Sequence, residues 1–152
     1  MKFKNSHFQT GFTLIEILVA VIILAIGMLG LASLQINTIK ANHGALQKTQ
    51  ATFLAYDIVD RLRANRNSAM AENYDIALAA SKPSAGTALP TIDINDWMTS
   101  IENLLPSGDG AVDCDNLGTC TVTITWDIAR EGETTSTGTA ITTRSYSFVA
   151  GI

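Results

Sequence analysis

An apolar run near the N-terminus constrains this chain more than any other feature. The eighteen residues from Ile17 to Leu34 carry no charge and almost no polarity. A helix rises about 1.5 Å per residue, so a helix over 12–34 would extend roughly 34 Å, enough to cross the hydrocarbon core of a bilayer. The sequence therefore predicts a helix that inserts in a membrane.

One carboxylate, Glu16, stands directly before this run and needs a compensating charge. An ionised carboxylate in hydrocarbon costs on the order of 2.5 to 3.5 kcal/mol, and a position near the helix end only reduces that cost. Cleavage between Gly11 and Phe12 would create an ammonium on Phe12, on the helical face that carries Glu16. It could pair with Glu16 of the same chain or of a neighbouring subunit, and either pairing would offset the charge.

Two simpler interpretations of the run remain open. Lys2 and Lys4 would form the basic start of a secretory signal, with Gly30-Leu31-Ala32 as its cleavage site. The apolar stretch of such a signal is usually about 7 to 15 residues long, so the length of this run argues against it. An uncleaved membrane anchor is the stronger alternative, because length alone would allow it.

The basic start, the segment Gly11-Phe12-Thr13-Leu14-Ile15-Glu16 and the apolar run together resemble the class III signal of type IV pilins and of the pseudopilins of type II secretion. The resemblance implies that a prepilin peptidase cuts after Gly11 on the cytoplasmic side and methylates the amine of Phe12. It also implies that Glu16 compensates the Phe12 amine of an adjacent subunit during assembly. The partners it implies are the peptidase, other major and minor pilins, and the inner membrane.

The expected organisation is a cleaved leader over 1–11, a transmembrane helix over 12–34 and a periplasmic domain over 35–152. No proline occurs in 35–70, so one helix is expected to continue from Phe12 to about Met70. The soluble half of this helix would form the spine of the domain. Its apolar stripe is expected to comprise Ile39, Leu46, Phe53, Leu54, Ile58 and Leu62.

After this helix the composition changes twice. Residues 79–90 are rich in Ala, Ser, Pro and Gly and predict a surface linker. Apolar residues at helical spacing then predict a short helix over 94–105, which Asp93 or Asn95 would cap. Trp97 belongs to the apolar stripe of this helix and is expected in the core.

An apolar period of two indicates strands in the last part of the chain. The predicted strand over 120–128 has one apolar face, formed by Val122, Ile124, Trp126 and Ile128. A polar turn region over 132–138 leads to a returning strand over 140–149, with Tyr146 and Phe148 on one side. Two or three antiparallel strands packed on the helix would give an α+β, type IV pilin-like fold.

Cys114 and Cys120 are the only cysteines. In an extracytoplasmic domain a disulfide is expected, and closing a loop of about seven residues would contribute roughly 2 to 2.5 kcal/mol. A metal pair and reactive thiols are the alternatives. They are weaker, because no histidine lies nearby in the sequence and the gap of five residues is not a usual zinc spacing.

A second resemblance is narrower than the first. The stretch from Tyr56 to Arg66, followed by Asn73-Tyr74, and the later order of Trp97, Leu104-Leu105-Pro106 and two glycines resemble PilV, the type IV pilus modification protein family of minor pilins. Many major pilins carry a proline in the membrane half of the helix, whereas the first proline here is Pro83. The resemblance therefore implies a minor pilin of the tip or initiation complex, which primes assembly and supports twitching motility and adhesion. Whether the tip contacts an adhesin is left open by the sequence.

Catalysis and nucleic-acid binding find little support in the sequence. His7 lies in the leader and His43 is expected on the helix surface, so we expect no catalytic site, no cofactor and no metal site. The net charge is −4, and it would become more negative when Lys2 and Lys4 are removed. An acidic chain is a poor general binder of nucleic acid.

Two other functions remain alternatives to a minor pilin of a type IV pilus. A minor pseudopilin of a type II secretion system shares the same signal and would differ in its cellular setting. A DNA-uptake or adhesive binding module would be indicated by binding to DNA with a strong salt dependence, which the acidic balance does not favour.

Overall fold

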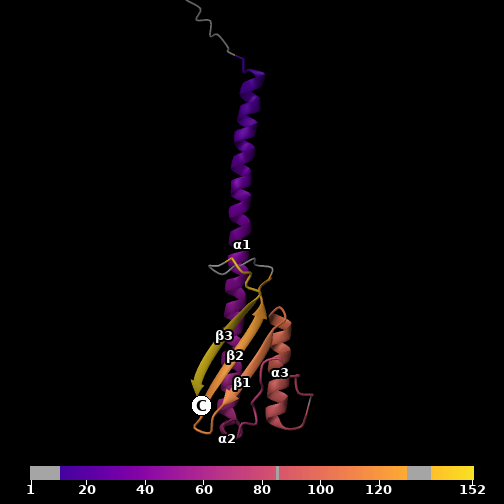
Figure 1. Ribbon diagram of the computed structural model, residues 1–152, viewed down its shortest axis with the longest axis vertical. Coiled ribbons are helices and arrows are strands. Elements are labelled where there is room, and N and C mark those ends of the chain that lie inside the picture. Colours follow the sequence, from indigo (N-terminus) through magenta and orange to yellow (C-terminus); the bar gives the residue numbers. More distant parts are fainter. Residues whose placement is uncertain (1–10, 85, 130–137) are drawn as a thin grey trace, which may run out of the picture. The chain divides into compact units, whose positions relative to one another are not determined.

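The computed structural model describes residues 11–84, 86–129 and 138–152 (Figure 1). Residues 1–10 of the predicted leader, with Lys2, Lys4 and His7, and most of the turn region over 132–138 lie outside the described residues. The chain divides into two compact units, Met1–Lys40 and Ala41–Ile152. The second unit combines helices with a three-stranded antiparallel sheet, which confirms the expected α+β fold.

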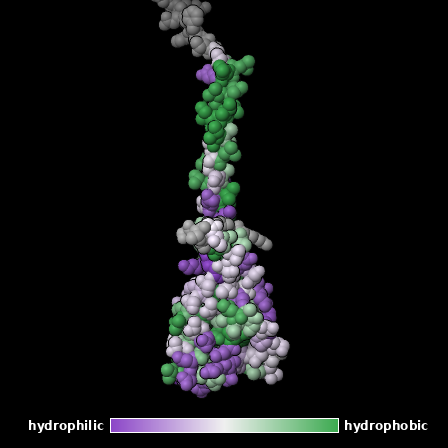
Figure 2. All heavy atoms as spheres, in the orientation of Figure 1, coloured by the Kyte–Doolittle hydropathy of each residue, from purple (hydrophilic) through white to green (hydrophobic). Residues whose placement is uncertain are grey.

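The first unit is dominated by helix α1, Leu14–Ala64, which continues into the second unit. Within the first unit all described side chains are exposed, and Figure 2 shows an almost continuous hydrophobic surface there. A helix that is apolar on all sides has no polar face for water, and such helices are typical of membrane spans. The helix is long and apolar enough to cross a membrane, although an N-terminal signal sequence meets the same criteria.

The spine helix ends earlier than the sequence predicted. Helix α1 stops at Ala64, and a short helix α2, Arg66–Met70, follows after a single non-helical residue. That residue, Asn65, has φ −125° and ψ 47°, and its side-chain amide donates a hydrogen bond to the Tyr74 hydroxyl. Asparagine competes readily for hydrogen bonds outside the helix, which explains a break where no proline occurs.

Half of the apolar stripe predicted for α1 is confirmed, and half is wrong. Leu54, Ile58 and Leu62 are buried, as expected, but Ile39, Leu46 and Phe53 are exposed. The seven-residue repeat drifts by about 20° per heptad on a straight helix, so it cannot remain on the core side. In the second unit the buried face of α1 comprises Gly44, Ala51, Leu54, Ala55, Ile58, Val59 and Leu62.

Helix α3, Leu89–Leu104, begins five residues before the predicted start at 94. Proline stands within its first turn, where its fixed φ suits a helix and its missing N–H costs nothing. The residue before the helix is Ala88, which provides no side-chain cap. Asp93 is therefore not the expected N-cap, but lies inside the helix and is buried. The predicted linker is shortened to 79–88.

The sheet contains three strands in the order β1-β2-β3, namely Asp109–Cys114, Thr119–Asp127 and Thr143–Gly151. Both neighbouring pairs are antiparallel. The β2–β3 pair corresponds to the two predicted strands, shifted by a few residues, whereas β1 was not predicted. Its sequence, DGAVDC, contains a glycine and two aspartates, which are depleted in strands.

The core lies between one face of the sheet, α3 and the second half of α1. Trp97 is fully buried, as predicted, and its indole N–H donates to the Leu54 carbonyl at 2.9 Å. Val122, Ile124, Trp126 and Ile128 are all buried along β2, which confirms the apolar face predicted for this strand. Gly110 allows β1 to pack against Trp97, because a Cβ at this position would lie 2.5 Å from the Trp97 ring. This explains why a glycine stands in a strand that the sequence did not predict.

A disulfide joins Cys114 at the end of β1 to Cys120 near the start of β2. The two residues are direct partners in the antiparallel register, so the disulfide closes the turn between these strands. Within this turn the Asp115 carboxylate accepts the N–H groups of Leu117 and Thr119 at 2.9 and 2.7 Å. These backbone hydrogen bonds stabilise the ionised carboxylate and lower the pKa of Asp115, and the bond from Thr119 has the largest effect.

Replacing both cysteines by alanine is expected to lower the free energy of unfolding by roughly 2 to 2.5 kcal/mol, because the unfolded chain gains loop entropy. Both residues are buried, so alanine avoids introducing an unpaired hydroxyl. Urea unfolding of the full chain in detergent, followed by tryptophan fluorescence, measures the change. A reducing agent should destabilise the original chain and have no effect on the double variant.

Candidate assembly site

The N-terminal end of α1 brings together the three residues that the sequence assigned to processing and assembly. Gly11, Phe12 and Thr13 precede the helix, and Glu16 lies in its first turn. Glu16 is the only charged residue between Leu14 and Ile39. Phe12 and Glu16 line one open groove on the helix surface, together with Ile17, Ala20, Val21 and Leu24.

Thr13 holds the first turn of α1, which carries Glu16, and the sequence analysis missed this role. Its hydroxyl accepts the backbone N–H of Glu16 at 3.3 Å, and its carbonyl accepts the N–H groups of Glu16 and Ile17. Thr13 is therefore the N-cap of α1. The signal was present in the sequence, because Thr-x-x-Glu before an apolar run is the pattern of a capping box.

The position of Glu16 also favours its charge for a local reason. A carboxylate in the first turn of a helix interacts favourably with the exposed N–H groups and the helix dipole, by about 0.3 to 1 kcal/mol. This is less than the roughly 2.5 to 3.5 kcal/mol that an ionised carboxylate costs deep in lipid. The helix end alone does not compensate an ionised Glu16, so the ionised form requires a further cation wherever this turn is surrounded by hydrocarbon.

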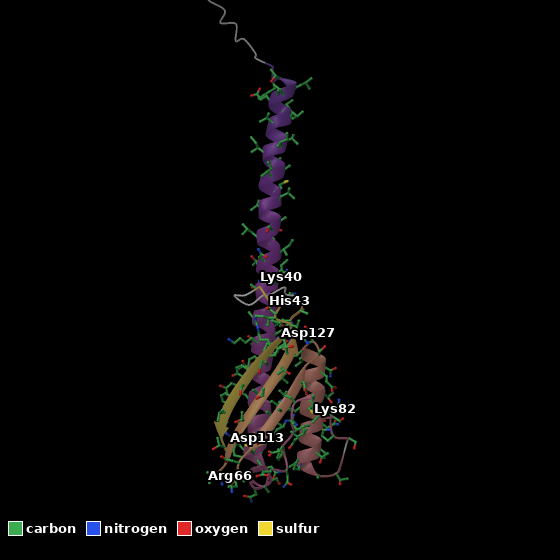
Figure 3. All side chains as sticks on the ribbon, viewed as in Figure 1. Lys40, His43, Arg66, Lys82, Asp113 and Asp127 are labelled. Carbon is green, nitrogen blue, oxygen red and sulfur yellow. A yellow bond between two sulfur atoms is a disulfide. The ribbon has the colours of Figure 1, made fainter. Side chains whose placement is uncertain are left out.

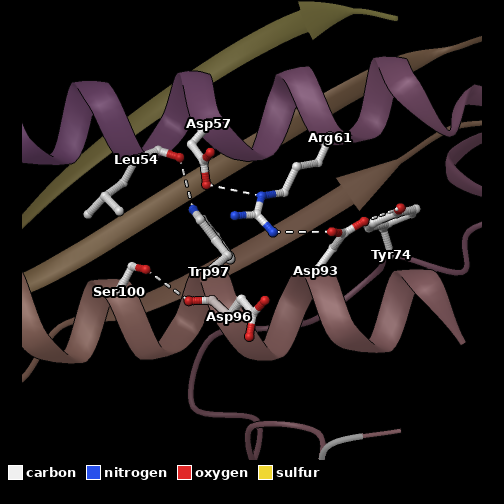
Figure 4. Close-up of polar contacts among 8 residues, drawn as sticks. All are labelled: Leu54, Asp57, Arg61, Tyr74, Asp93, Asp96, Trp97 and Ser100. Atoms are coloured by element: carbon white, nitrogen blue, oxygen red, sulfur yellow. Dashed lines mark hydrogen bonds and ion pairs between the residues drawn. The ribbon is translucent and has the colours of Figure 1, made fainter. Parts of the chain in front are cut away.

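A second polar cluster lies inside the Ala41–Ile152 unit and links α1 to α3 (Figure 4). Arg61 bonds Asp57 through Nε and Asp93 through Nη1, each at 3.1 Å. The Tyr74 hydroxyl donates to the other oxygen of Asp93 at 2.7 Å and accepts from the Asn65 amide at 3.1 Å. Burial alone would lower the pKa of Arg61, but the carboxylates of Asp57 and Asp93 outweigh it and raise that pKa.

Half of this cluster has a local sequence signal. Asp57 and Arg61 have the four-residue spacing of an acid-to-base pair on one helix face, and the structure contains this pair. The contacts of Asp93 join residues 19 and 32 positions apart in the sequence, so no local pattern could indicate them. The cluster holds the helices together, and its groups are satisfied by one another.

Burial raises the pKa of Tyr74 to about 12, with Asn65 opposing this shift and Asp93 supporting it. An unfolded tyrosine has a pKa of about 10, so the native state holds this proton more tightly. The free energy of unfolding should be unaffected below pH 10 and fall by about 2 to 3 kcal/mol as pH rises from about 10 to 12. Tyr74→Phe should remove this part of the alkaline loss, which urea unfolding at several pH values would measure.

In the described parts of the chain, the charged side chains outside this cluster are exposed or half-buried. His43 and Lys40 project from α1 in Figure 3, and His43 is exposed, as predicted. Lys82 pairs with Glu102 at 2.6 Å, and Arg66 donates to the Ile152 carbonyl at 2.9 Å. Among residues 11–84, 86–129 and 138–152, no three His, Cys, Asp or Glu side chains lie close enough together to hold a metal ion.

An apolar, capped N-terminal helix with a single acidic residue in its first turn, continuing into a small α+β domain, defines the class of pilins. Comparison with known families agrees with this class. Residues 7–32 match the prokaryotic N-terminal methylation motif, and residues 33–125 match the family type IV pilin Tt1218. The second match covers more than half of the chain, which therefore belongs to the type IV pilin Tt1218 family.

No curated protein and no solved structure matches the chain. Family membership establishes that the chain is a pilin structural subunit, and type IV pilins are not enzymes. The methylation motif implies processing by a prepilin peptidase and assembly with other pilins. The apolar helix that carries the motif indicates membrane anchoring and incorporation into a filament.

Proposed function

We propose that this chain is a minor pilin of a type IV pilus, cut after Gly11 and methylated on the new amine of Phe12. One observation supports this most directly: Glu16 is exposed in the first turn of a capped apolar helix, in one groove with Phe12. The match of 7–32 to the methylation motif supports the same processing site. Once cleaved, the chain offers both charges of an ion pair at one helix end.

In the proposed assembly, Glu16 of one subunit pairs with the Phe12 ammonium of its neighbour. Water exclusion cannot drive helices together in lipid, so close packing and polar contacts must do so. Glycine lets helix backbones approach closely in lipid, and α1 is uninterrupted at Gly27 and Gly30. A role for these glycines in close helix packing is therefore proposed rather than one in bending.

A minor rather than a major role is supported by two features. No proline precedes Pro83, and α1 is a continuous helix through the whole apolar run. The likeness of the Tyr56–Arg66 stretch to the PilV family points the same way. We place the chain in the inner membrane with a single span and a periplasmic domain, and then in a tip or initiation complex that primes pilus assembly and serves motility and adhesion.

The proposal is tested by deleting the gene and restoring it with the intact chain. Loss of surface pili and of twitching motility, with normal protein export, is the expected result. Loss of exported enzymes with intact pili would instead identify a pseudopilin of type II secretion. Retention of the chain on DNA with a steep salt dependence would indicate a binding module.

A further inference from the structure

The two edges of the sheet differ in how their backbone groups are satisfied. Along β1, Val112 exchanges two hydrogen bonds with Ile76, each at 2.9 Å, and the Cys114 N–H donates to Asp75 at 3.0 Å. The β1 edge is therefore covered by the chain after α2. In Figure 1, β3 forms the opposite edge of the sheet, and β1 is the strand that lies beside α3.

The hydrogen-bond phase shows which groups of β3 face outward. Just beyond the two ends of the β2–β3 register, Ile128 donates to Thr142, and Ile152 donates to Gly118. In an antiparallel pair, residues alternate between those that bond across the pair and those that do not. The even-numbered residues of β3 therefore bond to β2, and the odd-numbered residues direct N–H and C=O away from it. These outward groups, which we term the β3 edge, belong to Thr143, Ser145, Ser147, Val149 and Gly151.

Little in the described parts of the chain blocks this edge. Within residues 11–84, 86–129 and 138–152, the only backbone group of the β3 edge with a partner is the Gly151 carbonyl, which accepts from Arg63 at 3.3 Å. The strand has nine residues, no proline and a continuous register without a bulge. Proteins normally protect an edge strand with a short length, a proline or a bulge, because an open edge pairs with other chains.

Exposed apolar side chains flank the β3 edge. The ring of Tyr56 lies 5.1 Å from that of Phe148, and Tyr56 is 47% exposed. Phe53 lies one turn earlier on the same side of α1 and is 70% exposed, while Val149 on the strand is 61% exposed. An aromatic centre with charged groups at its margin, here Arg63, is the usual anatomy of a protein interface.

We propose that the β3 edge binds an extended strand of a different pilin subunit. The expected strand is uncharged along its middle and places apolar side chains against Phe53 and Tyr56. The charge of Arg63 makes no demand on it, because Arg63 already pairs with Asp60 at 3.3 Å. This inference rests on the proposed function, because it takes the partner from the filament. Backbone hydrogen bonds would provide affinity, and the aromatic side chains would provide selectivity.

A second copy of the chain fits less well. Its β1 edge is covered by residues 75–79, so head-to-tail pairing of identical sheets is blocked. Because Tyr56 contacts Phe148 and Arg63 contacts Gly151, α1 runs in the same direction as β3. If two β3 strands paired antiparallel, the α1 segments packed on them would run in opposite directions. Subunits that enter one membrane through the same end of α1 need these helices to run in the same direction.

The alternation of hydrogen bonds along β3 determines which substitutions test the inference in the full chain in its own cells. Because the Ser147 N–H faces outward, Ser147→Pro removes a donor of the edge and no backbone bond to β2. The hydrogen bond that the Thr123 hydroxyl donates to Ser147 Oγ at 3.4 Å is lost in Ser147→Ala as well, so that variant controls for it. It should keep the native melting temperature in detergent and reduce incorporation into sheared pili roughly tenfold, the effect of losing about 1.4 kcal/mol of binding. Ser147→Ala keeps the N–H and should incorporate normally. Phe148→Pro removes a bond to β2 and should unfold the domain.

The partner is identified with a photoreactive phenylalanine analogue placed at Ser147, or at the exposed Asp113 on β1, across the sheet, as the control. Adducts from position 147 alone, mapped by mass spectrometry to a strand of another pilin, are expected. Adducts only with a second copy, adducts equal at both positions, or none at all would overturn the inference. So would normal incorporation of Ser147→Pro, or its unfolding. If the original chain itself never enters pili, the proposed function has failed instead.

Discussion

Glu16→Ala is expected to leave the chain in the membrane and to keep it out of the filament. The substitution makes the helix more apolar, so insertion does not suffer. It leaves the Phe12 ammonium of a neighbouring subunit without a partner among packed helices. Removing one member of a buried ion pair costs about 3 to 5 kcal/mol, which corresponds to a loss of roughly a hundredfold or more in incorporation. The ratio of the chain in sheared pili to that in membranes measures the loss.

Two further variants separate the charge of Glu16 from its other roles. Glu16→Gln keeps the size of the side chain and should fail to incorporate nearly as completely. Thr13→Val removes the hydroxyl that caps Glu16 and should have only a modest effect, because a lost cap costs about 1 kcal/mol. Wild-type incorporation of Glu16→Gln would contradict the proposed pairing.

Among the polar side chains of the described residues, Asp93 is the one whose replacement by alanine is expected to lower the free energy of unfolding most. Asp93 is buried, accepts a hydrogen bond from Tyr74 and pairs with Arg61. Its removal leaves the Tyr74 hydroxyl without its acceptor and Arg61 without its buried partner. We expect a decrease of about 3 kcal/mol in the free energy of unfolding, below the full cost of an uncompensated buried charge because Arg61 retains Asp57. Urea unfolding reports it through the buried Trp97 and Trp126.

Controls on the same helices test whether burial is the cause. Asp96 lies one turn after Asp93 on α3 and is exposed, so Asp96→Ala should change stability by less than about 0.5 kcal/mol. Asp57→Ala removes the half-exposed partner of Arg61 and should cost less than about 1 kcal/mol. Equal losses for Asp93→Ala and Asp96→Ala would show that the buried cluster contributes no special stability.

The parts of the fold that depend on local composition could be predicted from the sequence. The apolar part of α1 follows from a run without charges, and the inward face of β2 follows from strict alternation. The Cys114–Cys120 disulfide followed from the compartment and from their being the only two cysteines, and the structure contains it. These features need no knowledge of distant contacts.

The parts that depend on tertiary packing could not be predicted. Gly110 weakens the local strand signal of β1, yet only glycine leaves room for the Trp97 ring. The seven-residue repeat of Ile39, Leu46 and Phe53 is exposed, because the core covers the face of α1 that carries the other predicted residues. Asp93 was assigned to a cap because it precedes an apolar stripe, although its partners Arg61 and Tyr74 are far away in the sequence.

The candidate site shows the same division. Gly11, Phe12 and Glu16 were assigned from their spacing, and these assignments remain proposals that rest on chemistry outside the folded chain. Thr13 could have been found from the Thr-x-x-Glu pattern and was overlooked. The β3 edge could not have been found, because it depends on which edge of the sheet the chain after α2 covers.

Mass spectrometry of the intact protein extracted from membranes and from pili tests the central claim most directly. The proposed pairing of Glu16 requires the Phe12 ammonium, which exists only after cleavage behind Gly11. The expected species starts at Phe12 and carries one methyl group on its amine. A functioning protein that retains its leader, or one that starts after Ala32, would contradict the account.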